Sequence, residues 1–187
     1  MAYPTVLDGH DALRPHILAE LSAKPPRLPT IERSLSSFIA EYRRAGPEVL
    51  VIRCVAPVET AADKLSAFAW RAIVRDRTSD KDDPTIVRHL HDLAMLESAI
   101  GANSHFPILL SETLLADSDR GGGGVASLPP AERLSTMLAI LDADEHYEVE
   151  YSRFVEGMAF AGDAEIPNFR IAREVVRRLS ALLPPLS

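Results

Sequence analysis

Cysteine is almost absent from this sequence of 187 residues, since Cys54 is the single example. One cysteine excludes an internal disulfide and a cysteine-based zinc site, and its apolar surroundings in EVLVIRCVA predict a core position. No apolar run approaches the ~18 residues that span a bilayer. The N-terminus has no basic stretch followed by an apolar one, which predicts that there is no secretory signal. We therefore expect a cytoplasmic protein with no membrane partner.

Positively charged residues are also fewer than negatively charged ones. The sequence has 20 Lys and Arg residues and 27 Asp and Glu residues, which gives a net charge of -7. Nucleic-acid binding through phosphate contacts requires clustered Lys and Arg. Binding driven by bulk charge is therefore disfavoured, and only a local basic face could serve. The hydrophobic share of 47% and the charged share of 25% are those of an ordinary globular chain.

Several common catalytic motifs are missing. There is no Gly-x-Ser-x-Gly nucleophile motif. The run Gly121–Gly124 lacks the Lys-Ser/Thr and the strand–helix context of a phosphate loop, so we expect a flexible connection there. Asp117-Ser118-Asp119 and Asp142-Ala143-Asp144 lie on no predicted strand, and residues two apart on a helix do not face each other. Both triplets are interpreted as solvated ends of helices.

The first 56 residues predict a small sheet. YPTVL (3–7) and HILAEL (16–21) are short β-compatible runs, and EVLVIRCVA (48–56) has the pattern of a buried strand between prolines. Between them, the spacing of apolar residues in IERSLSSFIAEYRRAG (31–46) predicts an amphipathic helix that ends at Gly46. We expect about three strands and one helix.

From residue 57 onward the apolar periodicity is helical. Asp83 is the expected N-cap and Pro84 the first residue of a helix that closes at Gly101. Residues 121–130 form the clearest loop. The predicted fold is therefore α+β, with a β-rich part at 1–56 and a helical bundle at 57–187. The other expected helices cover 59–77, 106–119, 131–160 (one long or two short) and 168–183.

The stretch VRHLHDLAML (87–96) places two histidines, an arginine and an aspartate close together on one predicted helix. Arg88 and Asp92 are four residues apart and share a face, as do His89 and Asp92 at a spacing of three, while His91 points elsewhere. An ion pair on a solvated face is one interpretation. A metal site would use His89 and Asp92 together with a third ligand from another element.

Two further features permit two interpretations each. Lys64, Arg71 and Arg75 follow one stripe of the preceding helix, either as long side chains on a surface or as a clamp for an anion. Glu20 lies within an otherwise apolar predicted strand. It is either a residue of a sheet edge or one of the converging carboxylates that hold magnesium.

The order of these pieces resembles a known family. PVETAADKL (57–65) fits P-x-x-T-x-x-x-K-L, and RHLHDL (88–93) fits R-H-x-x-D-L. The predicted strand that contains Glu20 and the helices at the end of the chain also match the order of elements in this family. In these features the chain resembles the AbiEii/AbiGii-type nucleotidyltransferase toxins over nearly its whole length.

The resemblance implies a role for each candidate residue. Glu20 would be a magnesium ligand, Lys64 and Arg88 would contact nucleotide phosphates, and Asp92 would be a base or an orienting acid. Arg71 and His89 would join the phosphate contacts. The implied cofactors are Mg2+ and a nucleoside triphosphate, and the implied partners are a cognate antitoxin and, as for some relatives, a transfer RNA.

One family motif, a Gly-Ser turn followed by Asp-x-Asp on a strand, is not found. We therefore expect residues 1–56 to be the remnant of a nucleotidyltransferase palm, and the chain alone to be inactive. Two alternatives are a non-catalytic helical interaction module of a toxin–antitoxin or phage-defence system, and a metal-dependent enzyme built on Glu20, His89 and Asp92. A half-built sheet would leave an exposed edge, which favours a homodimer.

Overall fold

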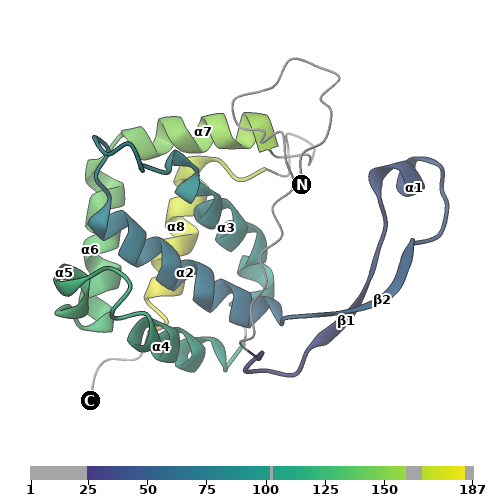
Figure 1. The fold of residues 1–187 in the computed structure, drawn as a ribbon, viewed down its shortest axis with the longest axis horizontal. Helices are drawn as coiled ribbons and strands as arrows, with labels where there is room; N and C mark the ends of the chain where they lie inside the picture. Colours follow the sequence, from purple (N-terminus) through teal and green to yellow (C-terminus); the bar gives the residue numbers. More distant parts are fainter. Residues whose placement is uncertain (1–24, 102, 159–165, 184–187) are drawn as a thin grey trace.

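Helices dominate the fold, and a small sheet projects from them (Figure 1). The structure is a computed structural model that describes residues 25–101, 103–158 and 166–183. The predicted α+β class with a helical majority is confirmed. In chain order the elements are β1 (Ile31–Leu35), α1 (Phe38–Tyr42), β2 (Val49–Cys54), α2 (Pro57–Val74), the 3-10 helix η1 (Pro84–Val87), α3 (Arg88–Ile100), α4 (Phe106–Ala116), α5 (Gly123–Ala126), α6 (Pro130–Ala143), α7 (His146–Met158) and α8 (Phe169–Ser180).

The sheet consists of two antiparallel strands within the described ranges. Ile31 of β1 lies opposite Cys54 of β2, and the register shifts before Leu35. We call residues 31–54 the β-arm; Figure 1 shows it extending away from the helices with α1 at its far end. The expectation that β2 is a buried strand is wrong, because Leu50 is 76% and Val51 is 60% exposed. Cys54 is only half-buried and is not in the core.

The predicted helix over 31–46 is also wrong in its first half. Residues 31–35 form β1, and the helix is limited to Phe38–Tyr42, with the Ser37 hydroxyl accepting a hydrogen bond from the Ala40 N–H. Pairing with β2 satisfies the backbone of residues 31–35 outside a helix, so tertiary context overrides the apolar spacing. The chain leaves the helix at Arg44, which has a φ of 52°.

Two predictions about the N-terminal part are not tested. The strands expected at 3–7 and 16–21 lie outside the described residues, so a sheet of three strands stays a prediction. The division of the chain after residue 56 stays one too. In the structure β2 ends at Cys54 and α2 begins at Pro57.

The helix signals from residue 57 onward agree with the structure. The Asp83 carboxylate accepts from the Thr85 N–H at 3.0 Å, Pro84 begins η1, and α3 ends before Gly101. Within the expected segment 131–160, the described residues form two helices, α6 and α7, separated by Asp144 and Glu145. The loop expected at 121–130 is partly wrong, because it contains the short helix α5 and the start of α6.

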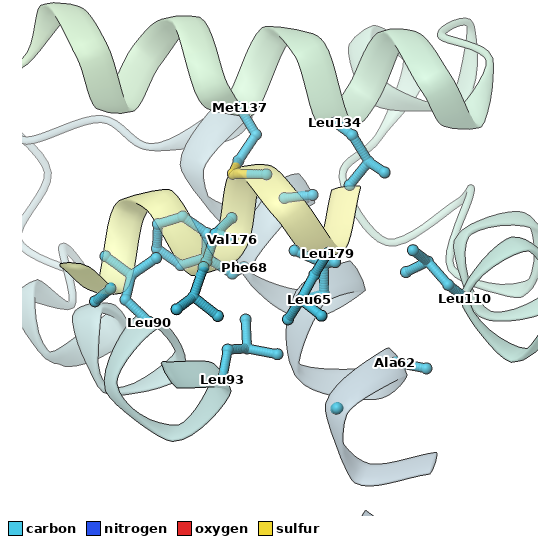
Figure 2. Close-up of a cluster of buried hydrophobic side chains, with 14 of the residues drawn as sticks. Ala62, Leu65, Phe68, Leu90, Leu93, Leu110, Leu134, Met137, Val176 and Leu179 are labelled. Atoms are coloured by element: carbon cyan, nitrogen blue, oxygen red, sulfur yellow. The ribbon is translucent and has the colours of Figure 1, made fainter. Parts of the chain in front are cut away.

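α2 lies at the centre of the helical part and packs against α3, α4 and α6. Its apolar stripe meets the leucines of α3 and the inner face of α8 (Figure 2). Each such side chain contributes ~1.5–3 kcal/mol when it is fully buried. This packing fixes α2 and α3 side by side, so that polar residues flanking the stripe can face each other. The labelled core residues are Ala62, Leu65 and Phe68 (α2), Leu90 and Leu93 (α3), Leu110 (α4), Leu134 and Met137 (α6), and Val176 and Leu179 (α8).

Candidate functional site

The α2–α3 contact brings together five of the six residues that the sequence singled out. Lys64 forms an ion pair with Asp92, and Arg71 Nη1 lies 3.3 Å from His89 Nε2. Arg88 begins α3 beside them. We call these five residues the cationic cluster. The sixth residue, Glu20, lies outside the described residues.

His89 is the buried centre of the cationic cluster, with 8% of its surface exposed. A guanidinium can only donate, so Nε2 accepts from Arg71 and the imidazole proton belongs on Nδ1. Burial first, and then the charges of Lys64, Arg88 and Arg71, lower the pKa of His89 to about 3. The ring is therefore neutral at pH 7. Its buried Nδ1 has no hydrogen-bond partner in the part of the chain that the structure describes.

Arg71 and Arg88 have no carboxylate partner within 4 Å among the described residues. Arg88 Nη1 donates to the Thr85 hydroxyl at 3.0 Å, and the Arg71 guanidinium lies over the Trp70 ring at 5.3 Å from its centroid. Both arginines are half-buried. Two guanidiniums thus keep most of their donors free for an external anion.

The third cation of the predicted stripe on α2, Arg75, has a different role. Its side chain is 6% exposed and bonds both carboxylate oxygens of Asp82 at 2.7 and 2.8 Å and both of Glu150 at 2.8 Å. It also stacks on Tyr147. Arg77 completes this network with Glu150 and Asp144. Arg75 therefore ties α2 to α7, which the sequence could not indicate because Glu150 is 75 residues away.

The described residues do not fit a metal ion. They contain no group of three or more His, Cys, Asp and Glu side chains that could hold one. Of the ligands expected in the metal-enzyme alternative, His89 has Nε2 directed at Arg71 and Asp92 is paired with Lys64. Nearby cations also repel a divalent ion. His91 points away as predicted, with its ring packed edge-on against Phe154 of α7.

The Asp-x-Asp triplets have structural partners and are not simply solvated. Asp117 accepts from the Ser66 hydroxyl at 2.8 Å and pairs with Arg120. Asp142 pairs with Arg177 of α8 at 2.9 Å. A second arginine of α8, Arg178, pairs with Glu97 of α3, so the positive charge of the last helix is partly neutralised.

Fold and site together define a helix-dominated α+β protein whose central helices hold two arginines that pair with no carboxylate of the described residues. A family model described as "Nucleotidyl transferase AbiEii toxin, Type IV TA system" matches residues 1–175. The chain therefore belongs to the AbiEii nucleotidyl transferase toxin family, as the resemblance predicted. No curated protein and no solved structure matched the chain.

The family carries two implications. A nucleotidyltransferase implies a nucleoside triphosphate as substrate, and the type IV toxin–antitoxin class implies a cognate antitoxin. Among the described helices, none is both long enough and apolar enough to cross a membrane.

Proposed function

We propose that this chain binds the triphosphate of a nucleotide through Arg71 and Arg88, as part of an AbiEii-type nucleotidyl transfer. One observation carries the proposal: two half-buried arginines, which no carboxylate in residues 25–101, 103–158 and 166–183 pairs with, flank a buried, neutral histidine. Guanidiniums bind phosphate oxygens through paired charge-assisted hydrogen bonds. A triphosphate would supply the negative charge that these arginines lack.

Lys64 can join the phosphate contacts by exchanging its partner. Its side chain is 27% exposed and that of Asp92 is 35% exposed, so water reaches the ion pair. Such pairs contribute only ~0–1 kcal/mol, and a phosphate group can therefore replace Asp92. The exchange releases the Asp92 carboxylate to orient an acceptor group or to accept a proton from it.

His89 can bind the same triphosphate, because its neutral imidazole can donate a hydrogen bond. With Nε2 facing Arg71, the proton lies on Nδ1, and that N–H lacks an acceptor within the described ranges. A buried unsatisfied donor costs ~1–3 kcal/mol. A small rotation of the ring toward a phosphate oxygen would satisfy it.

Nucleotidyl transfer also requires carboxylates that hold magnesium and take up charge on the phosphates. The family's Gly-Ser turn followed by Asp-x-Asp on a strand is not found in the sequence, and the described residues do not fit the ion. We therefore propose that these 187 residues bind the nucleotide and do not transfer it alone, with Glu20 as a magnesium ligand only in a completed palm. A transfer RNA remains the proposed acceptor, and the cytoplasm the proposed location.

Calorimetric titration with each ribonucleoside triphosphate tests the proposal. The Arg71→Ala, Arg88→Ala double variant should bind at least about a hundredfold more weakly, since each charge-assisted contact contributes ~1.5–3 kcal/mol. Arg170→Ala on the exposed side of α8 is the matched control and should leave the affinity unchanged. Equal affinities for the double variant and the unmodified chain would refute the proposal.

The non-catalytic interaction module is the second candidate, and one observation favours it. Apolar side chains on the β-arm are exposed, including Leu50 at 76% and Ile39 at 64%. Exposed apolar patches of this kind mark sites of protein association. If no nucleotide binds at millimolar concentration, the β-arm becomes the principal functional surface.

A further inference from the structure

A surface pocket of about 380 Å³ opens beside the cationic cluster. We propose that it receives the nucleoside, the sugar and base, of the triphosphate whose phosphates bind the cluster. This inference rests on the proposed function and adds a second subsite to it. The pocket lies between the C-terminal half of α2 and the segment that leads into α3. Its lining residues are Arg71, Val74, Arg75, Asp76, Ser79, Lys81, Asp82, Asp83 and Ile86.

Pocket and cluster are continuous. Arg71 lines the pocket and also contacts His89. Asp83 lines it too, and the charges of Arg88 and Arg71 act on its carboxylate. A ligand that extends from the pocket past Arg71 therefore reaches Arg88. Pockets for small molecules have volumes of ~300–1,000 Å³, so a nucleoside fits this one.

The polar lining sets the direction in which a nucleotide can lie. Asp76 and Asp83 are acceptors when ionised, whereas both oxygens of Asp82 already accept from Arg75. They repel phosphates and attract donors such as ribose hydroxyls and the amino groups of bases. The phosphates therefore point toward Arg71 and the nucleoside toward the aspartates. Arg75 does not reverse this preference, because Asp82 and Glu150 already bind it.

Asp83 is the residue best placed to recognise the nucleoside. Burial raises its pKa, but hydrogen bonds from Thr85 and the charges of Arg88 and Arg71 outweigh this and hold the pKa below the usual range. Its contacts with Thr85 use one carboxylate oxygen, Oδ1. Oδ2 has no hydrogen-bond partner among the residues of known placement. Val74 and Ile86 supply apolar surface against which a base can pack.

A second hollow suits a nucleotide less well. It has a volume of about 570 Å³ and follows α7. Glu145, Glu148 and Glu156 line it together with a single cation, Arg153. This excess of negative charge repels a triphosphate, and no residue of the cationic cluster reaches it.

Titrations with ATP and with inorganic tripolyphosphate separate the two subsites. Asp83→Asn keeps the N-cap, because Asn caps helices as well as Asp does. Val74→Trp fills the pocket without changing a charge. Both variants should weaken ATP binding about tenfold, the loss of one hydrogen bond or of the packing surface. Neither variant should weaken tripolyphosphate binding, and Asp83→Asn should strengthen it because a charge that repels phosphates is removed. Asp80→Asn is the matched control, since Asp80 is exposed and absent from the lining.

Each outcome is decisive. If both variants bind ATP as the unmodified chain does, and Arg71→Ala with Arg88→Ala abolishes binding, the nucleoside subsite is refuted and the proposed function stands. If neither ATP nor tripolyphosphate binds the unmodified chain, both are refuted. A tenfold loss that appears equally with tripolyphosphate also overturns the subsite, because the pocket would then act on the phosphates. Thermal unfolding of each variant confirms that it is folded.

Discussion

Arg71 lies in the last turn of α2 and Arg75 caps the end of that helix, and the two arginines have opposite electrostatic surroundings. Arg75 is bound by two carboxylates, whereas Arg71 contacts the neutral His89 and the Trp70 ring. The same residue type at the same helix face therefore stabilises the fold at one position and is available to a ligand at the next.

The first prediction concerns stability. Replacing Arg75 with Met should destabilise the protein by ~3–5 kcal/mol, because Asp82 and Glu150 lose a partner that is 6% exposed. Replacing Arg71 with Met should cost only ~1–2 kcal/mol, because among the described residues it breaks no ion pair and removes one hydrogen bond, to the buried His89 Nε2. Denaturation by urea measures both. A loss of equal size at the two positions would contradict the assignment.

The second prediction concerns pH. The pKa of His89 is about 3 in the folded protein and ~6.5 in the unfolded chain. Between these values the unfolded chain binds more protons, so the stabilisation is complete above pH 6.5 and declines as the pH falls. Through His89, the unmodified protein should lose about 2 kcal/mol of its free energy of unfolding between pH 6.5 and pH 5. The His89→Gln variant should not show this part of the loss. Over that range most carboxylates stay ionised.

Urea denaturation at each pH gives this slope, and His105→Gln on an exposed histidine is the control. His91, whose pKa burial also lowers, will leave some pH dependence in the His89 variant. An unchanged slope in His89→Gln would mean that His89 is protonated in the folded protein or that water reaches it.

The third prediction tests the exchange of partners by Lys64. Asp92→Asn removes the competitor for Lys64, so nucleotide should bind a few times more tightly, which corresponds to the ~0–1 kcal/mol of such a pair. Lys64→Ala should bind more weakly, with a smaller dependence on salt. Calorimetry at low and high salt measures both. Weaker binding by Asp92→Asn would show that the carboxylate positions Lys64 instead of competing for it.

The fourth prediction concerns the homodimer. Leu50→Lys places a charge on the exposed β-arm and should yield a monomer at every concentration examined by sedimentation. Ile171→Lys on α8, a position that is 45% exposed, is the control and should leave the association state unchanged. If the unmodified chain is itself a monomer in sedimentation, the homodimer is excluded, and the exposed β-arm must have another partner.

Much of the helical part could be predicted from sequence, whereas the β-arm could not. The cap at Asp83, Pro84 and the stop at Gly101 are local signals, and the structure contains each of them. Residues 31–46 have a helical spacing of apolar residues as well, but Ile31–Leu35 pair with β2 instead. Strand pairing depends on a partner strand elsewhere in the chain, and the local spacing of apolar residues carries no information about that partner.

The sequence by itself determined the family, the helical class and the residues on α2 and α3 that carry charge, because motif spacing and apolar periodicity are local properties. Only the tertiary structure decided which of those charges are neutralised. Glu150 and Asp82 reach Arg75 because α7 packs against η1 and places Tyr147 edge-on to Phe68 of α2. No carboxylate of the described residues pairs with Arg71 or Arg88. Electrostatic pairing acts over a few ångströms in space, whatever the separation along the chain.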